Sequence, residues 1–349
     1  MKKGNGNDSG PKILDEYREK IDRADEQIIS LLTRRQELAL EIGRLKRETG
    51  MKFLDHAREQ KLLRSLASKG NRNLSSQAIR SIFSEIISAA RSSQQLPVVA
   101  YLGPEATFSH QAAISIFGSS ASFRSAESIE EVFDLAEKDV CHQGVVPIEN
   151  SYEGSVNITF DLFYKYDLKI CAEVFVRIRH HLLSKAERIG DIRHLYSQHM
   201  TVPQCRSWMM AADEADAAAV GSRFCSQTYG LNILEEDIED NPDNVTRFLV
   251  INKNGSEPTG KDKTSLLFFL QHQPGALHRT LEALADRGVN MARIESRPMK
   301  LRNWEYLFFV DIEGHEKDSN VGEALKEMEA QCVFMKRLGS YPAGGDPWD

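Results

Sequence analysis

The 349-residue sequence predicts a multidomain chain with an all-α domain, an α/β domain and an α+β domain of the ferredoxin-like type. Three observations predict this. Apolar residues recur at steps of three and four over residues 13–48, short β-rich runs alternate with helical runs after Pro97, and the last 80 or so residues follow the order βαββαβ. A chain of this length can bury two or three separate cores. The predicted domains span residues 11–96, 97–254 and 262–343.

Cysteine usage and hydropathy narrow the class of protein. The five cysteines are odd in number and far apart, with neither a CxxC pair nor a histidine cluster at zinc spacing. No run approaches the roughly 18 apolar residues of a spanning helix, and the charged, glycine-rich start does not resemble a signal peptide. We therefore expect a cytoplasmic protein with reduced thiols, without a metal site, a cofactor or a membrane partner.

The net charge is unevenly distributed. The first 95 residues hold 19 Lys and Arg against 13 Asp and Glu, so their net charge is +6, whereas the whole chain has a net charge of −7. The basic residues are interleaved with acids along a helical pattern and few aromatic residues accompany them, which disfavours a nucleic-acid surface. A small polyanionic metabolite is the expected partner of this segment.

The first predicted helix is unusually long. At about 1.5 Å per residue, residues 13–48 would span more than roughly 50 Å, beyond the roughly 30 Å of a small domain. This helix therefore needs a partner, which we expect to be a second chain. Gly50 ends it, Asp55 can cap a second helix, and Ser75 or Ser76 can begin a third.

Two cations interrupt the apolar face of that helix. Arg35 lies midway between Ile28 and Ile42 on one seam, and Lys46 follows eleven residues later, within about 20° of the same face. Long side chains at such positions often reach solvent along the helix edge. A pair at this spacing, in a segment with net positive charge, favours an anion site instead. Arg18 lies roughly 26 Å before Arg35 and could join the site only from a partner helix running the other way.

The middle of the chain offers loops suited to anions at the ends of its strands. "GPEATFSH" (residues 103–110) and "VVPIENSYEGSVN" (145–157) link strands to helices through glycine and hydroxyl residues, although either could be a simple turn. "TVPQ" (201–204) fits a helix capping box that opens a helical run over 204–219. "NPDNVTRFLVI" (241–251) reads as a turn leading into an apolar strand.

The last domain carries two motifs for binding. A glycine turn at Pro274-Gly275 leads into a helix, and "RIESRP" (residues 293–298) ends an apolar strand in a charged cluster. Pro298 excludes a central position for that strand. Neither place holds a nucleophile next to a base, so binding is expected there and not catalysis.

Together these motifs resemble one family, the bifunctional chorismate mutase–prephenate dehydratases of phenylalanine biosynthesis, which end in an ACT regulatory domain. The resemblance runs from about Lys12 to Pro342 and rests on a helical segment "REKIDRADEQIISLL" followed in order by "LGPEATFSHQAA", "VVPIENSYEGSVN", "DNVTRFLVI", "PGAL" and "ESRP". It implies conversion of chorismate to prephenate and of prephenate to phenylpyruvate, with phenylalanine as effector. A dehydratase that prefers arogenate, and an amino-acid sensor with decayed catalytic sites, stay open as alternatives.

The resemblance implies roles for seven residues of the first domain, and this domain would form an intertwined helical homodimer or part of a higher homo-oligomer. The seven are Arg35 and Arg58 as carboxylate clamps, Lys46 and Gln94 as donors to the ether oxygen of chorismate, Asp55 and Glu59 as contacts or supports for its hydroxyl, and Arg18 as the arginine from the other subunit. Ala90 stands where the family often has serine.

For the second domain the resemblance implies two α/β lobes around a cleft, as in periplasmic binding proteins of type II. Thr246 is the implied proton donor for the departing hydroxyl, with Arg247 as a structural or carboxylate partner and Phe248 completing the motif. The implied cleft residues are Asn150, Ser151, Ser197 and Gln204. This chain reads Gln198-His199-Met200 where the family usually has His-Pro-Gln.

In the ACT domain two family motifs are expected to enclose phenylalanine between paired domains. They are Gly275, Ala276 and Leu277, followed by His278 where valine is common, and Glu295, Ser296, Arg297 and Pro298.

Overall fold

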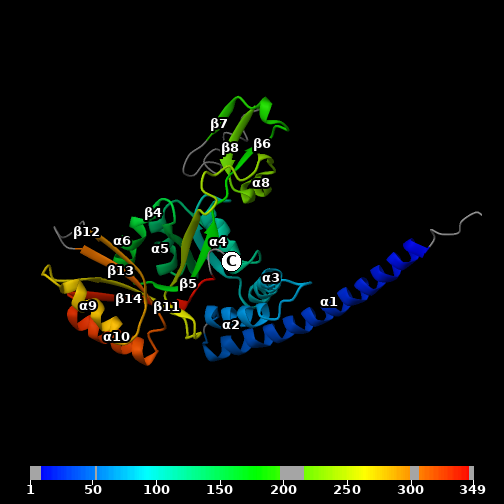
Figure 1. Ribbon diagram of the computed structural model, residues 1–349. Helices are drawn as coiled ribbons and strands as arrows, with labels where there is room; N and C mark the ends of the chain where they lie inside the picture. Colours follow the sequence, from blue (N-terminus) through cyan, green and yellow to red (C-terminus); the bar gives the residue numbers. More distant parts are fainter. Residues whose placement is uncertain (1–8, 52, 197–215, 299–305, 346–349) are drawn as a thin grey trace, which may run out of the picture.

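The computed structural model describes residues 9–51, 53–196, 216–298 and 306–345. Figure 1 shows a helical part with one long projecting helix, a central α/β part with an upper lobe, and a sheet with two helices on the side opposite the free end of the long helix. The predicted layout of all-α, α/β and α+β parts is confirmed.

The helical part comprises α1 (Ser9–Thr49), α2 (His56–Ala67) and α3 (Ser76–Gln94). The predicted helix ends are confirmed. Gly50 takes a positive φ of 65° directly after α1, where a residue without Cβ is least strained. The Asp55 carboxylate accepts a hydrogen bond from the Arg58 backbone N–H, and the Ser75 hydroxyl accepts one from that of Ala78. Ser75, and not Ser76, is thus the cap of α3.

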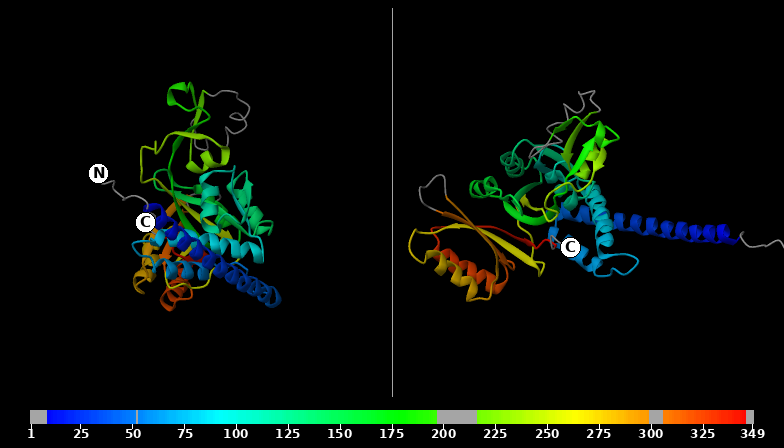
Figure 2. Two further views of the ribbon diagram at one scale, coloured as in Figure 1. Left: turned by 90° about the vertical axis from the view of Figure 1, so that its right-hand side faces the viewer. Right: turned by 45° about the horizontal axis from the view of Figure 1, so that its top comes forward.

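Only the C-terminal part of α1 packs on the rest of the chain. Gln36 and Arg47 donate hydrogen bonds to the backbone oxygens of Ala89 and Gln94 on α3. The remainder projects away from the other helices (Figures 1 and 2). The large apolar residues at least half exposed along it are Ile13, Leu14, Tyr17, Ile21, Ile28, Ile29 and Leu31. A single chain therefore leaves an apolar stripe of α1 uncovered, and the second chain that would cover it stays a prediction.

The central lobe is a six-stranded sheet in the order β2-β1-β3-β10-β5, with β4 paired to β3. Its elements are β1 (Val98–Leu102), α4 (Phe108–Phe117), β2 (Ser122–Ala126), α5 (Ile129–Glu137), β3 (Gln143–Asn150), β4 (Gly154–Ser155), α6 (Asn157–Lys165), β5 (Lys169–Arg177) and β10 (Val245–Asn252). Strand β10 runs antiparallel to both β3 and β5. The chain leaves this sheet after β5, builds the upper lobe and returns through β10. The "TRF" strand therefore lies inside the sheet, between β3 and β5.

The upper lobe is a second sheet in the order β7-β8-β6-β9. Its elements are β6 (His181–Ser184), a 3-10 turn η1 (Ile189–Asp191), β7 (His194–Tyr196), β8 (Ala217–Gly221), α8 (Arg223–Tyr229) and β9 (Asn232–Glu235). The helix expected over residues 204–219 is wrong at its end, because Ala217, Ala218 and Ala219 form β8. Alanine favours helices, but these residues pair with β6 and β7 and are almost completely buried, so packing overrides propensity. Residues 204–215 lie outside the described part.

The last domain is a four-stranded antiparallel sheet in the order β12-β13-β11-β14. Its elements are β11 (Asp262–Phe269), α9 (Ala276–Ala285), β12 (Met291–Pro298), β13 (Tyr306–Glu313), α10 (Ser319–Gln331) and β14 (Phe334–Pro342). The predicted order βαββαβ is confirmed. Strand β12, which ends at Pro298, is an edge strand, as the proline predicted.

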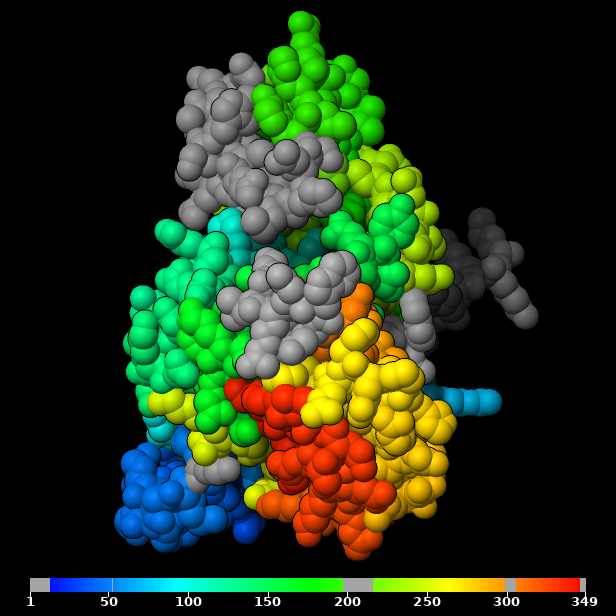
Figure 3. All heavy atoms as spheres, turned by 90° about the vertical axis from the view of Figure 1, so that its left-hand side faces the viewer, coloured from blue at the N-terminus to red at the C-terminus, as the bar shows by residue number. Residues whose placement is uncertain are grey.

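The domains share contacts that join them into one body. Phe160 of α6 and Phe309 of β13 belong to one apolar cluster, and their ring centres are 4.9 Å apart. On the helical side, Lys61 donates a hydrogen bond to the Pro258 oxygen at 2.8 Å, and Arg64 donates one to the Ala343 oxygen at 2.9 Å. Figure 3 shows the last domain (yellow to red) below the central and upper lobes. Within the described ranges, no helix combines the length and the apolar character needed to cross a membrane.

Candidate functional site

The two cations of the α1 seam are turned toward protein. Lys46 donates from Nζ to the Phe53 oxygen at 2.9 Å, and Arg35 donates from Nη1 to the Ile86 oxygen of α3 at 3.4 Å. Both are half-buried, whereas the nearby Arg34 is exposed, and burial lowers the pKa of the Arg35 guanidinium. Partly desolvated cations attract an anion more strongly than solvated ones. This arrangement favours the anion site over cations that merely reach solvent.

Gln94 comes to the same end of α1 as Lys46. Its side chain lies over Gly43, one helical turn before Lys46, and a Cβ at Gly43 would be 2.8 Å from Gln94 Cγ. A side chain at position 43 would therefore force Gln94 to shift. The result is that an amide and an ammonium, 48 residues apart in the sequence, occupy neighbouring turns of one helix face.

The candidate residues of α2 have separate surroundings. Asp55 caps the helix, and together with Arg58 and Lys61 it lines an open pocket of about 410 Å³, which Glu257 and Pro258 also line. Glu59 forms an ion pair of 3.3 Å with Arg91 of α3, whose side chain is 8% exposed. Among the described residues, no hydrogen bond or ion pair joins Arg58 or Glu59 to Arg35 or Lys46.

Arg18 lies on the projecting part of α1. Its side chain is 66% exposed and forms an ion pair with Asp15 at 3.2 Å, one turn away on the same helix. An arginine in this place can reach the other mutase candidates only through a second chain, so its role stays a prediction.

In the central lobe, Asn150 and Thr246 face each other across strands β3 and β10. Asn150 Nδ2 donates to Thr246 Oγ1 at 2.8 Å and to Asn244 Oδ1 at 2.7 Å. The orientation of the amide is set by its oxygen, which accepts the backbone N–H groups of Tyr152 and Glu153. Because the Thr246 hydroxyl accepts a hydrogen bond here, its own proton is free to be donated elsewhere.

Ser151 is hydrogen-bonded to the residue that precedes Thr246. Its backbone N–H donates to the Val245 oxygen at 2.8 Å, and its hydroxyl accepts the Val245 N–H at 3.0 Å. The loop that carries Asn150 and Ser151 is thus hydrogen-bonded to the start of β10.

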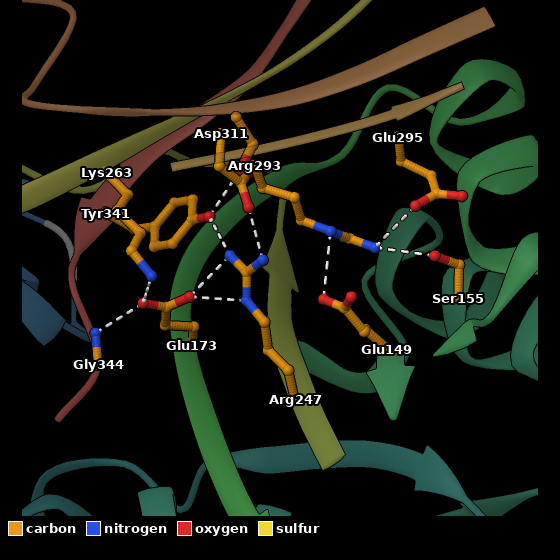
Figure 4. Close-up of polar contacts among 11 residues, drawn as sticks. Glu149, Ser155, Glu173, Arg247, Lys263, Arg293, Glu295, Asp311, Tyr341 and Gly344 are labelled. Carbon is orange, nitrogen blue, oxygen red and sulfur yellow. Dashed lines mark hydrogen bonds and ion pairs between the residues drawn. The ribbon is translucent and has the colours of Figure 1, made fainter. Parts of the chain in front are cut away.

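Arg247 points to the other side of β10, into a buried ion-pair cluster (Figure 4). Its guanidinium donates to Glu173 of β5 at 2.8 Å and to Asp311 of the last domain at 2.5 Å, and also to the Tyr341 hydroxyl. The Arg247 side chain is 6% exposed, and the two carboxylates beside it keep its pKa well above the usual value. Of the two roles expected for Arg247, these contacts favour the structural one. None of the contacts faces Thr246.

Phe248 is also turned inward. It is buried in the apolar cluster that covers one face of the sheet against α4. Any influence of its ring on substrate would have to pass through packing, and not through a direct contact.

Two expected cleft residues, Ser197 and Gln204, lie outside the described residues, as do Gln198, His199 and Met200. A pocket of about 410 Å³ lies between the lobes, between α4 and β5 on one side and α8 on the other. It is lined by Arg179, His181 and Arg223 and contains neither Asn150 nor Thr246. The hydrogen-bonded Asn150–Thr246 pair defines the candidate site better than this pocket does. No group of acidic, histidine and cysteine side chains suited to a metal ion occurs in the described ranges.

The effector motifs lie at the start of α9 and on the edge strand β12. Gly275 takes a positive φ of 77° and caps α9, which lets the chain turn directly into Ala276 and Leu277. On β12, Glu295 and Arg297 are half-buried, while Ser296 and Pro298 alternate with them on the exposed face, and exposed His278 follows Leu277. Arg297 donates to the Asn157 oxygen and to Asp161 of α6. One motif residue therefore already contacts the central lobe.

Comparisons with known proteins agree with this layout. Family models match for chorismate mutase type II at residues 17–95, prephenate dehydratase at 99–214 and 209–256, and the ACT domain at 264–330. The bifunctional chorismate mutase/prephenate dehydratase of Aquifex aeolicus is 42% identical over 353 residues, which cover 94% of this chain and 98% of the relative. That of Stutzerimonas stutzeri is 37% identical, covering 94% and 97%.

The chain is a member of the bifunctional chorismate mutase/prephenate dehydratase family. A solved structure of the prephenate dehydratase of Arthrobacter aurescens in complex with L-Phe is 31% identical, with a TM-score of 0.63, and covers 70% of this chain and 90% of that one. The described part of the dehydratase and ACT domains therefore has the architecture of this family. The departure at Ala90 is buried in α3, so this family member lacks a hydroxyl at that position of the helix.

The partners of Arg247 were not predicted from the sequence. Glu173 and Asp311 are 74 and 64 residues from Arg247 in the sequence, and both lie inside apolar strand runs. That placement was the available signal, because a charge in a buried strand requires an opposite charge. The same holds for Arg293, which reaches from β12 of the ACT domain to Glu149 of the dehydratase domain.

Proposed function

We propose that this chain carries out two successive reactions of phenylalanine biosynthesis. The first domain rearranges chorismate to prephenate, and the second converts prephenate to phenylpyruvate with loss of water and carbon dioxide. Phenylalanine bound to the ACT domain regulates the enzyme by feedback. The observation that carries this proposal is the Asn150–Thr246 pair, found in a chain whose family combines both activities.

The mutase reaction is a rearrangement within one dicarboxylate and needs no nucleophile. The site must hold the substrate folded and stabilise the charge that develops on the breaking ether oxygen. Lys46 and the Gln94 side chain, which lie at neighbouring turns of α1, would donate to that oxygen. Arg35 and Arg58 would bind the carboxylates, with Asp55 and Glu59 holding α2 and the substrate hydroxyl in place.

The dehydratase reaction needs a proton at the departing ring hydroxyl. Because Asn150 donates to Thr246 Oγ1, the threonine proton is directed away from Asn150 and toward the substrate. The negative charge left on Thr246 during proton transfer is stabilised by the same Asn150 hydrogen bond. Ser151, Ser197 and Gln204 would complete the cleft, and Arg247 and Phe248 would hold β10 in place through their buried contacts.

The assembly and location belong to the same proposal. The uncovered apolar stripe of α1 supports a homodimer in which each Arg18 enters the site of the other subunit. The described cysteines Cys141, Cys225 and Cys332 are free thiols, in keeping with a cytoplasmic enzyme. We place the domain boundaries between Gln94 and Val98 and between Asn252 and Asp262.

The test is incubation of the purified full-length protein with chorismate, following prephenate and phenylpyruvate with and without phenylalanine. The proposal predicts transient prephenate, then phenylpyruvate, and a slower reaction with phenylalanine present. Consumption of arogenate but not of prephenate would instead identify an arogenate dehydratase. Phenylalanine binding without turnover of any of these substrates would identify a sensor.

A further inference from the structure

Arg293 of the ACT domain holds the loop that carries Asn150. Its Nε lies 3.2 Å from Glu149 Oε2, and its Nη2 donates to the Ser155 hydroxyl at 2.9 Å. Glu149 and Ser155 are paired residues of β3 and β4 at the base of one short hairpin. Arg293 therefore contacts both strands of the hairpin, as Figure 4 shows.

The guanidinium lies at the junction of the two domains. It is 5.5 Å from the ring centre of Phe160 in the dehydratase domain and 5.5 Å from that of Phe309 in the ACT domain. The Arg293 side chain is 11% exposed, and its buried Nη1 atom has no hydrogen-bond partner among the residues that the structure describes. A buried donor without a partner costs free energy. A small change in the neighbouring residues can therefore alter which acceptors the Arg293 guanidinium binds.

The same side chain also contacts the effector motif. Nη2 of Arg293 lies 3.8 Å from Oε2 of Glu295, two residues further along β12. Glu295 is the only carboxylate of the "ESRP" motif, and the ammonium group of an amino acid needs an anionic or acceptor partner. A ligand that engages Glu295 would alter how the Arg293 charge is shared between Glu295 and Glu149.

We propose that Arg293 is the positioning residue through which an amino-acid effector at β12 acts on the dehydratase site. This inference rests on the proposed function. The path is short: Glu295 contacts Arg293, Arg293 holds Glu149, and the next residue, Asn150, orients the Thr246 hydroxyl. An effector that shifts Arg293 changes the orientation of the Asn150 amide and hence that of the Thr246 hydroxyl, without approaching the substrate.

The test compares Arg293→Gln with wild type in the full-length protein. Two quantities are measured: the dissociation constant of phenylalanine by calorimetry, and the ratio of dehydratase kcat/KM without and with saturating phenylalanine. The relay predicts phenylalanine affinity within about threefold of wild type and a kcat/KM ratio reduced at least about fivefold. Arg287→Gln is the matched control, because Arg287 forms its ion pairs with Glu323 and Glu327 inside the ACT domain.

Glu149→Gln should lower the same kcat/KM ratio. The double variant should lower it no further than either single variant, because both substitutions remove the same contact between Arg293 and Glu149. Unchanged inhibition of Arg293→Gln would overturn the relay. Lost phenylalanine binding by Arg293→Gln would place Arg293 in the effector site and overturn it as well.

Hydrogen exchange separates this inference from the proposed function. Phenylalanine should change the exchange of residues 145–150 in wild type and not in Arg293→Gln, whether or not the protein turns over prephenate. An absence of turnover in wild type would refute the proposed function alone. An unchanged exchange in phenylalanine-bound wild type would refute the relay alone.

Discussion

The side-chain amide of Asn150 donates a 2.8 Å hydrogen bond to the Thr246 hydroxyl, and its own oxygen accepts two backbone N–H groups of the following turn. The turn thus decides which end of the amide faces Thr246. A carboxylate in place of the amide would accept a hydrogen bond from Thr246 instead of donating one.

Asn150→Asp should therefore turn the Thr246 proton away from substrate. We expect dehydratase kcat to fall by about 10²–10⁴, the usual contribution of a positioned proton donor, while mutase activity is unchanged. Steady-state assays with supplied prephenate measure this. Thr246→Ser, which keeps the hydroxyl, is the control and should retain most activity. A fully active Asn150→Asp enzyme would exclude this orientation of the proton donor.

Gly43→Ala tests the packing behind the mutase site. Alanine favours a helix by about 1 kcal/mol over glycine, but its Cβ would lie 2.8 Å from Gln94 Cγ. Gln94 must then move away from the turn next to Lys46, and we expect mutase kcat to drop at least about tenfold without loss of helix content. Chorismate consumption and circular dichroism measure the two effects. Exposed Glu41→Ala on the same helix is the control, and equal activity of the two variants would argue against a role for Gln94.

Asp311→Ala tests the buried cluster that joins β10 to the ACT domain. Removing it leaves the buried Arg247 guanidinium with Glu173 as its one carboxylate partner among the described residues. The expected loss in the free energy of unfolding is about 3–5 kcal/mol, seen as a lower melting temperature. Glu327→Ala, which breaks a more exposed ion pair with Arg287, should cost no more than about 1 kcal/mol. Similar losses in the two variants would show that burial of the cluster does not matter.

His56 predicts a pH dependence at the contact of the mutase and dehydratase domains. It is buried and hydrogen-bonded to Gln143 at 2.8 Å, and burial lowers its pKa from the ordinary value of 6.5. As the pH falls below about 6.5, His56 binds a proton in the unfolded chain but stays neutral in the folded protein. The free energy of unfolding therefore decreases. Melting curves between pH 7.5 and 5 should show a steeper decline for wild type than for His56→Gln. Parallel declines would mean that His56 is not the group responsible.

The sequence predicted the features whose cause is local. Asp55 and Ser75 cap helices because each precedes a helical run, and Gly50 and Pro298 act through their own backbone. Ala217–Ala219 were mistaken for helix because alanine propensity carries no information on the strands that enclose them.

Contacts between distant segments could not be predicted. The sequence places Arg247 beside Thr246 but does not show that Glu173 and Asp311 occupy its guanidinium. Likewise, the sequence indicates only that Arg293 belongs to a charged strand end. Its ion pair with Glu149 depends on the packing of the ACT domain against the dehydratase domain. The roles that the family resemblance gives to the mutase residues need a second chain for Arg18 and stay predictions.

Two separate sites acting in series are the central claim, and one pair of variants tests it most directly. With chorismate supplied, Thr246→Ala should accumulate prephenate in an amount equal to the chorismate consumed and form almost no phenylpyruvate, because the first domain is untouched. With prephenate supplied, Lys46→Ala should form phenylpyruvate at the wild-type rate while leaving chorismate unused. Phenylpyruvate formation at a near-normal rate by Thr246→Ala, or loss of both activities in a folded Lys46→Ala protein, would contradict the account.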